Sequence, residues 1–168
     1  MNKKLLRNYN IKIQSLSNNE HSFMFEFSQD LFEFFSNENE IQNTKGSCKV
    51  VIVKSDIMLN TIFLIDGETQ LICDRTLEKY IHKINFQKKI LFKFGDIEEE
   101  LSDEILIIDR NKPIINIAKY IYEFFILELP VKRLHPSLKN EDNIDTFVFS
   151  TKKNNEIDPR LDPLNKLK

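Results

Sequence analysis

The chain has 168 residues, 41% of them hydrophobic, and a formal net charge of -2. This length gives one domain with a real hydrophobic core, and the near-neutral charge excludes a protein that holds nucleic acid by bulk positive charge. Two cysteines and no apolar N-terminal segment predict a reducing, cytoplasmic location, and no apolar run approaches the roughly 20 residues that span a bilayer.

Both ends of the chain are basic around a mildly acidic body. The N-terminal arm contains Lys3, Lys4, Arg7 and Lys12 before the first acidic residue, and residues 151–168 contain five basic and three acidic residues. This pattern suits termini that touch RNA or an acidic protein patch. A solvated arm and a solvated tail explain it equally well.

Strand patterns dominate the first two thirds of the chain. In residues 23–27, three phenylalanines recur at every second position, which is typical of a half-buried strand. Residues 31–35 predict either another strand or a short helical turn capped by Ser28 or Asp30. Residues 36–47 are polar and rich in Asn and Glu, and they predict a loop.

Further strand-length runs of β-branched and aromatic residues follow. After the run at residues 61–65, Asp66 and Gly67 predict a hairpin or bulge, because Gly accepts positive φ without steric cost. The remaining runs lie at residues 50–53, 70–73, 90–94 and 105–108. Together the runs predict an antiparallel sheet, either open or curled towards a barrel-like form.

One main helix is predicted after Pro113, which makes the fold class α+β. Asn116 is placed to cap this helix and Pro130 to stop it. Its apolar positions recur at three- and four-residue spacing: Ile117, Ile121, Phe124 and Leu127. Fourteen Phe and no Trp indicate that Phe supplies much of the core volume.

We expect a single α+β domain over residues 1–135, which includes the basic N-terminal arm. Residues 136–168 contain three prolines and lose the apolar periodicity, so they predict an extended or partly disordered tail. The tail ends in a docking segment or in a segment that folds back on the sheet. Its candidate contact residues are Asp158, Arg160, Leu161, Leu164 and Leu167.

Several short motifs occur in a fixed order along the chain. They are Cys73-Asp74-Arg75-Thr76-Leu77-Glu78, Glu123, Leu129-Pro130, His135 and the terminal segment from Asp158 to Leu167. In this order and at this spacing they resemble the YceD family, the large-subunit ribosomal RNA accumulation proteins. The resemblance implies a role in making the large ribosomal subunit, and no known chemistry.

The positions best carried over from the family motif are Arg75, Leu77 and Glu78. Arg75, Glu78, the adjoining Asp74 and His135 are candidate partner-binding residues. A guanidinium in a fixed loop can fork onto a phosphate or a carboxylate. An internal ion pair, for instance of Arg75 with Glu123, is the structural alternative. A histidine can titrate or bind metal near neutral pH, but one beside a proline more often fixes a turn by hydrogen bonding.

In the family, the position of Cys73 belongs to a Cys-x-x-Cys-like pair that can reach one metal ion, usually zinc. Here Thr76 stands at the second position, and a hydroxyl is a poor zinc ligand. We therefore predict no metal and no cofactor. A structural module with a degenerate zinc site is the alternative.

No Ser/His/Asp arrangement and no nucleotide-binding loop are recognisable, so the chain is not expected to be an enzyme. The leading hypothesis is a cytoplasmic ribosome biogenesis factor that supports large-subunit (23S) ribosomal RNA accumulation or processing. It would bind a precursor RNA, a ribosomal protein or a maturation protein.

Overall fold

The computed structural model describes residues 3–36 and 41–138. The chain divides into two compact units, residues 1–136 and 137–168, and the first contains the sheets. The described helices are α1 (Lys3–Arg7), α2 (Gln29–Phe35), α3 (Ala118–Leu127) and the 3-10 helix η1 (Pro136–Leu138). The described strands are β1 (Asn10–Lys12), β2 (Glu20–Ser28), β3 (Gln42–Lys54), β4 (Met58–Ile72), β5 (Lys79–Gly95), β6 (Glu99–Ser102), β7 (Ile105–Asp109) and β8 (Ile114–Asn116).

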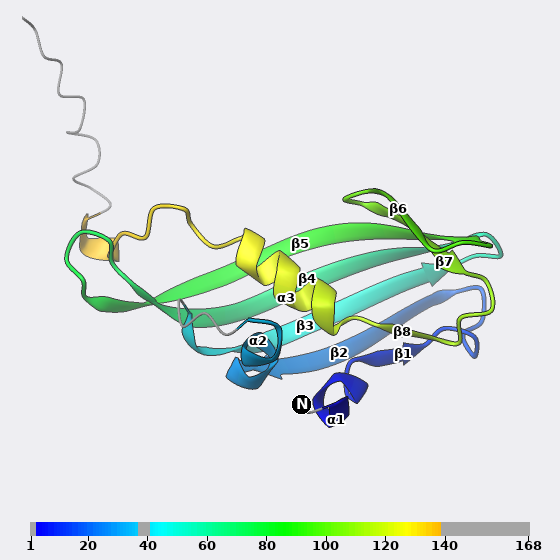
Figure 1. Cartoon of the computed structure of the whole chain (residues 1–168), viewed down its shortest axis with the longest axis horizontal. Helices are drawn as coiled ribbons and strands as arrows, with labels where there is room; N and C mark the ends of the chain where they lie inside the picture. Colours follow the sequence, from blue (N-terminus) through cyan, green and yellow to red (C-terminus); the bar gives the residue numbers. More distant parts are fainter. Residues whose placement is uncertain (1–2, 37–40, 139–168) are drawn as a thin grey trace, which may run out of the picture. The chain divides into compact units, whose positions relative to one another are not determined.

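The main sheet has the strand order β2-β3-β4-β5-β7-β6, and β1 pairs with β8 in a separate two-stranded sheet. Figure 1 shows the long strands β3, β4 and β5 side by side at its centre. The α+β class is confirmed. The barrel-like form is wrong, because β2 and β6 stand at opposite ends of the strand order and leave the sheet open. The sheet is also mixed, since β7 runs parallel to β5.

The hairpin or bulge predicted at Asp66 and Gly67 is wrong, because β4 runs through both residues without a break and pairs there in regular register. Gly67 lies directly opposite Gly46 of β3. A Cβ atom on Gly67 would lie 3.0 Å from a ring carbon of Phe27 and 3.2 Å from a ring carbon of Phe125. Gly67 therefore serves close packing within a strand, not a turn.

The loop predicted at residues 36–47 is wrong in its second half, because β3 begins at Gln42. The polar residues there are accommodated by specific contacts. Thr44 is buried, and its hydroxyl lies 2.8 Å from the hydroxyl of Thr69 on β4. Residues 31–35 adopt the helical alternative, within α2, whose N-cap residue is Ser28.

Helix α3 ends three residues before Pro130, and Ile117 occupies its N-cap position. The side-chain oxygen of Asn116 accepts a hydrogen bond of 3.1 Å from the backbone N–H of Ala118, so it satisfies one free donor of the first turn. The predicted buried stripe is wrong at Leu127, which is 76% exposed. The fully buried Phe125 contacts the core instead.

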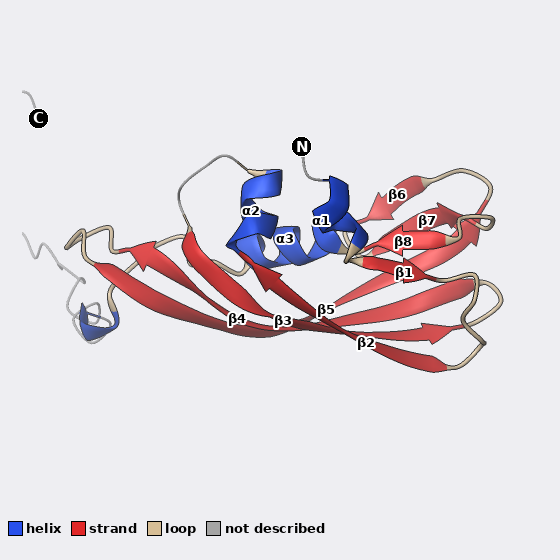
Figure 2. Cartoon of the chain, turned by 90° about the horizontal axis from the view of Figure 1, so that it is seen from below, coloured by secondary structure: helices blue, strands red, loops and turns tan. Residues whose placement is uncertain are grey.

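Helices α1, α2 and α3 lie on one face of the main sheet, which we call the inner face (Figure 2). Phe63 of β4 and Phe92 of β5 point to this face, and both rings pack against Tyr120 of α3, with centroid distances of 6.0 and 5.6 Å. Phe125 stacks edge-on against Phe27 and Phe32. The core is therefore built largely from phenylalanine, as predicted.

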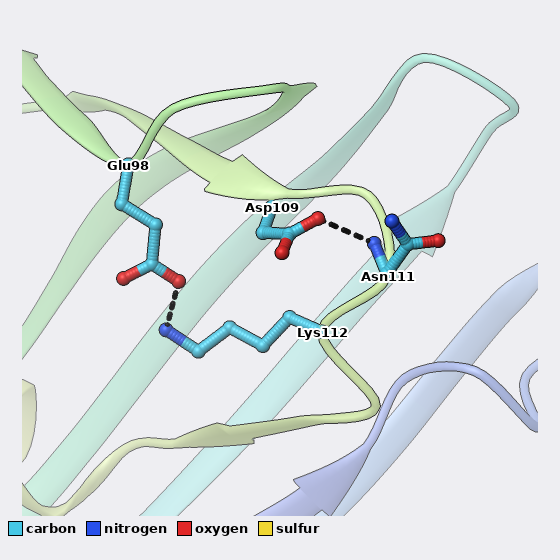
Figure 3. A network of polar contacts seen from close by, with 4 residues as sticks. All are labelled: Glu98, Asp109, Asn111 and Lys112. Atoms are coloured by element: carbon cyan, nitrogen blue, oxygen red, sulfur yellow. Dashed lines mark hydrogen bonds and ion pairs between the residues drawn. The ribbon is translucent and has the colours of Figure 1, made fainter.

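A polar network fixes the chain between β7 and β8 (Figure 3). The carboxylate of Asp109 accepts a hydrogen bond of 2.8 Å from the backbone N–H of Asn111 and so closes the turn. Lys112 forms an ion pair of 2.6 Å with Glu98, just before β6. The ion pair ties this turn to the β6 hairpin.

Among the helices of residues 3–36 and 41–138, none is both long and apolar enough to cross a membrane.

We predict that Gly46→Ala lowers the free energy of unfolding by about 1 to 3 kcal/mol. The added methyl would overlap the backbone of Asp66 and Gly67 and the ring of Phe27, and the backbone atoms cannot move aside cheaply. Urea unfolding measures the change, with Ser47→Ala as the neighbouring control. Equal stability of the two variants would contradict the close packing at this point.

Candidate functional site

The turn between β4 and β5, residues 73–78, holds three of the predicted partner-binding residues, Asp74, Arg75 and Glu78. Its ends are joined by a hydrogen bond of 2.9 Å from the backbone N–H of Cys73 to the carbonyl of Glu78. A second bond of 2.9 Å, from Leu77 N–H to the Cys73 carbonyl, tightens the turn. Leu77 has a φ of 58°, in the left-handed region that non-glycine residues rarely adopt. The turn thus holds a strained backbone in one fixed shape.

The sulfur atom of Cys73 lies at the centre of this turn and is fully buried. It accepts hydrogen bonds from the backbone N–H groups of Thr76, at 3.5 Å, and His135, at 3.3 Å. Hydrogen bonding by the Thr76 side chain is the largest cause that lowers the pKa of Cys73 to about 7, against the opposing effect of burial. Backbone N–H groups of Thr76, His135 and Arg75 lower the pKa further. A thiolate at this point is stabilised by donors from two distant segments.

The segment that follows α3 is bound to the same turn. The backbone N–H of Asp74 donates to the carbonyl of Arg133 at 2.8 Å, and the backbone N–H of Arg133 donates to the Asp74 carboxylate at 2.7 Å. With the bond from His135 to Cys73, these contacts join residues 133–135 to residues 73–74. We call this set of three hydrogen bonds the clip.

Aromatic packing also stabilises the clip. The ring of Tyr80, on β5, stacks edge-on against His135 at a centroid distance of 5.8 Å. Burial, followed by the charges of Cys73 and Asp74, raises the pKa of the Tyr80 hydroxyl. Leu134, between the two clip residues, is 9% exposed. The segment is therefore held by both polar and apolar contacts.

The outer side of the turn faces solvent. Asp74, Arg75 and Glu78 are all exposed, as is Leu77 at 76%. The Thr76 hydroxyl donates a hydrogen bond of 3.4 Å to the Glu78 carboxylate. The turn thus presents charged side chains on a backbone that the clip holds in place.

The structure brings the predicted residues Asp74, Arg75, Glu78 and His135 together within one turn and one clip. The carboxylate of Glu123, considered as a partner for Arg75, pairs with Lys119 on its own helix at 3.3 Å. The remaining predicted residues lie outside the described residues: Asp158, Arg160, Leu161, Leu164 and Leu167. The sequence did not predict the role of Arg133. This residue contacts Asp74 through its backbone N–H and carbonyl, which any residue type supplies.

The residues around Cys73 do not fit a metal site. No group of three or more His, Cys, Asp or Glu within residues 3–36 and 41–138 could hold a metal ion. The Thr76 hydroxyl is a poor zinc ligand, and the backbone of His135, not its ring, reaches the sulfur. The other cysteine, Cys48, is buried in the middle of β3, where burial raises its pKa to about 12. Hydrogen bonds occupy the Cys73 sulfur where a metal would otherwise bind.

The family model for the large ribosomal RNA subunit accumulation protein YceD matches residues 63–168. The matched part is more than half of the chain and includes both the turn and the segment of the clip. The chain belongs to the YceD family. The turn at residues 73–78 and the clip are therefore features of a YceD domain.

One curated relative is the uncharacterized protein YlbN of Bacillus subtilis (strain 168), which is 31% identical over 111 residues. The aligned part covers 62% of this chain and 63% of that protein. The chain thus matches less than two thirds of the relative's length. No solved structure matches the chain at a significant level.

We predict that Asp74→Ala lowers the free energy of unfolding by about 1 kcal/mol, since it leaves the Arg133 N–H without its carboxylate acceptor. Hydrogen exchange at the amides of Arg133 and His135 should accelerate, while exchange in α3 stays unchanged. Glu78→Ala is the control, because its carboxylate makes no contact in the clip. Unchanged exchange at both amides in the Asp74 variant would contradict the clip.

The lowered pKa of Cys73 makes stability depend on pH. Between pH 7 and about 9 the folded state releases this proton and the unfolded state keeps it, so stability rises with pH. We expect the stability difference between the protein and its Cys73→Ala variant to grow from pH 6.5 to pH 8.5 in urea titrations. The difference for Cys48→Ala should not grow and should fall slightly towards pH 8.5, because burial raises the pKa of Cys48 and only the unfolded state begins to release that proton. A difference for Cys73→Ala that shrinks as the pH rises would show that the folded state does not stabilise the Cys73 thiolate.

Proposed function

We propose that this protein is a non-enzymatic ribosome biogenesis factor that acts in the cytoplasm and supports accumulation or processing of large-subunit (23S) ribosomal RNA. The observation that carries the proposal is the family match over residues 63–168, whose family name is that of a large ribosomal RNA subunit accumulation protein. The turn, the clip and the segment between them all fall within the matched residues.

The proposed mode of action is binding to a precursor RNA, or to a ribosomal or maturation protein, through the turn at residues 73–78. The clip holds the backbone of the turn, so little conformational entropy is lost when a partner binds. Arg75 is exposed and carries a planar guanidinium that matches phosphate and carboxylate groups. The exposed carboxylates of Glu78 and Asp74 add hydrogen-bond acceptors for donor groups of a partner.

The chemistry of the turn favours binding over catalysis. Cys73 carries the thiol of the turn, yet its sulfur is buried and accepts hydrogen bonds from two backbone donors. A nucleophile must reach its substrate, and this sulfur is turned into the fold. The reactive group therefore has a structural use, which supports a factor that recognises a partner without transforming it.

The terminal residues from Asp158 to Leu167 stay a predicted second contact. Their apolar positions recur every three residues and alternate with charge, which is typical of peptides that dock into a partner groove. Removing residues 157–168 from a tagged protein and comparing the recovered RNA and proteins separates this contact from the turn.

We predict that deletion of the gene lowers the ratio of large-subunit to small-subunit ribosomal RNA in the cell, and that the tagged protein sediments with large-subunit precursors. An Arg75→Ala/Glu78→Ala variant should fail to restore the ratio, because both exposed charges of the turn are lost. Lys119→Ala, which changes an exposed residue of α3, should restore it.

Two results together would contradict this function. They are a protein that stays at the top of the sucrose gradient and a ribosomal RNA ratio that is unchanged by deletion. Full restoration by the Arg75→Ala/Glu78→Ala variant would keep the function but remove the turn from it.

A further inference from the structure

Strand β5 is the most basic element of the described chain. It carries five lysines, His82 and no acidic residue in a protein whose formal net charge is -2. The lysines are Lys79, Lys83, Lys88, Lys89 and Lys93, and all are exposed. The strand begins directly after Glu78, so the basic strand adjoins the turn described above.

Four of these lysines point to the same side of the sheet. The buried residues of β5, among them Phe92, occupy even-numbered positions and face α3. Side chains alternate along a strand, so odd-numbered residues point to the opposite, outer face. Lys79, Lys83, Lys89 and Lys93 therefore form one row on the outer face, which we call the basic row.

The edge of the sheet beside this row is open. β4 pairs with β5 from Lys79 to Lys93, but β7 pairs with it only from Leu91 to Gly95. Within the described residues, no strand lies beside residues 79–90 on that side. An extended ligand can therefore follow the row without meeting a neighbouring strand.

Acidic groups near the row are engaged in other contacts or lie at its two ends, where Asp74 and Glu78 precede Lys79. Glu68 stands opposite Lys83 in the register, but its carboxylate pairs with Lys45 at 3.1 Å. Asp66 accepts a hydrogen bond of 2.8 Å from Asn85. The acidic residues of 96–104 follow β5 at its C-terminal end, where Lys112 pairs with Glu98 (Figure 3). The lysines near the C-terminal half of the row, Lys89 and Lys93, stand opposite the uncharged Ile62 and Met58 in the register.

We propose that the basic row binds the phosphate backbone of RNA. At about 3.3 Å per residue, Lys79 and Lys83 stand about 13 Å apart and Lys83 and Lys89 about 20 Å apart, so the row spaces point charges along an extended chain. A polyanion that carries charge at regular intervals can meet each lysine in turn. This proposal rests on the function proposed above and assigns the RNA contact to a surface of its own.

The test uses the full chain and two probes, a single-stranded poly(U) of about 20 nucleotides and a mixed-sequence RNA duplex of similar length. Affinity is measured from about 50 to about 200 mM salt. In the variant Lys79→Gln/Lys83→Gln/Lys89→Gln, we expect the slope of log K against log salt for poly(U) to become shallower by about two, since each lost phosphate contact removes about 0.7. The single variant Lys83→Gln should show about a third of that change in slope.

The matched control is Arg110→Gln/Lys119→Gln/Lys132→Gln, which removes the same charge from exposed residues outside both β5 and the basic N-terminal arm. Of these, Lys119 belongs to α3, on the inner-face side of the sheet (Figure 2). The control should keep the slope of the unaltered protein. Equal losses in the two triple variants would overturn the proposal, because bulk charge would then explain binding.

Two other outcomes separate the row from the proposed function. An unaltered protein that binds neither RNA probe, yet restores ribosomal RNA in cells, overturns the RNA contact and leaves the function standing. If the row binds a ribosomal protein instead, the RNA contact is likewise overturned. A lost salt slope with a normal ribosomal RNA ratio in cells supports the RNA contact and breaks its link to that function.

Discussion

The packing of α3 on the glycine pair of the sheet is the contact on which the rest of the structure depends. Gly46 and Gly67 lie opposite each other on β3 and β4, and their missing side chains leave room for the rings of Phe27 and Phe125. Because α3 lies this close to the sheet, its aromatic side chains, among them Tyr120 and Phe125, pack against aromatic residues of the inner face. Close aromatic packing in a buried layer contributes more to stability than surface ion pairs such as Lys119 with Glu123.

The position of α3 also sets where the chain goes next. The residues after it run back to the turn between β4 and β5, where the backbone of Arg133 and His135 meets Asp74 and Cys73. Two parts of the chain about sixty residues apart are thus joined by backbone hydrogen bonds at one end of the sheet. The buried Cys73 sulfur accepts hydrogen bonds from both parts, and its lowered pKa reflects the donors around it. The charged side chains of the turn and the lysines of β5 then project from a scaffold that the packing of α3 has fixed.

Much of the fold was predictable from local pattern, and the rest depended on contacts between distant residues. The period-two pattern of residues 23–27 and the β-branched runs predicted strands correctly, because alternation is a local property. The pair Asp66 and Gly67 misled, since the reason for Gly67 is a ring of α3 that packs against it from far along the chain. The parallel pairing of β7 has no local signature either. At the candidate site, the family resemblance selected Asp74, Arg75, Glu78 and His135, but it could not foresee that the His135 backbone caps the Cys73 sulfur.

Cross-linking in living cells tests the central claim most directly, which is that one end of this domain, the turn with the adjoining strand β5, contacts large-subunit RNA. Tagged protein would be irradiated with ultraviolet light in its own cells, and both the linked RNA and the linked peptides would be identified. The account predicts large-subunit ribosomal RNA attached to peptides from residues 73–93. Cross-links confined to peptides of α1, α2 or α3, or to RNA unrelated to the large subunit, would contradict it.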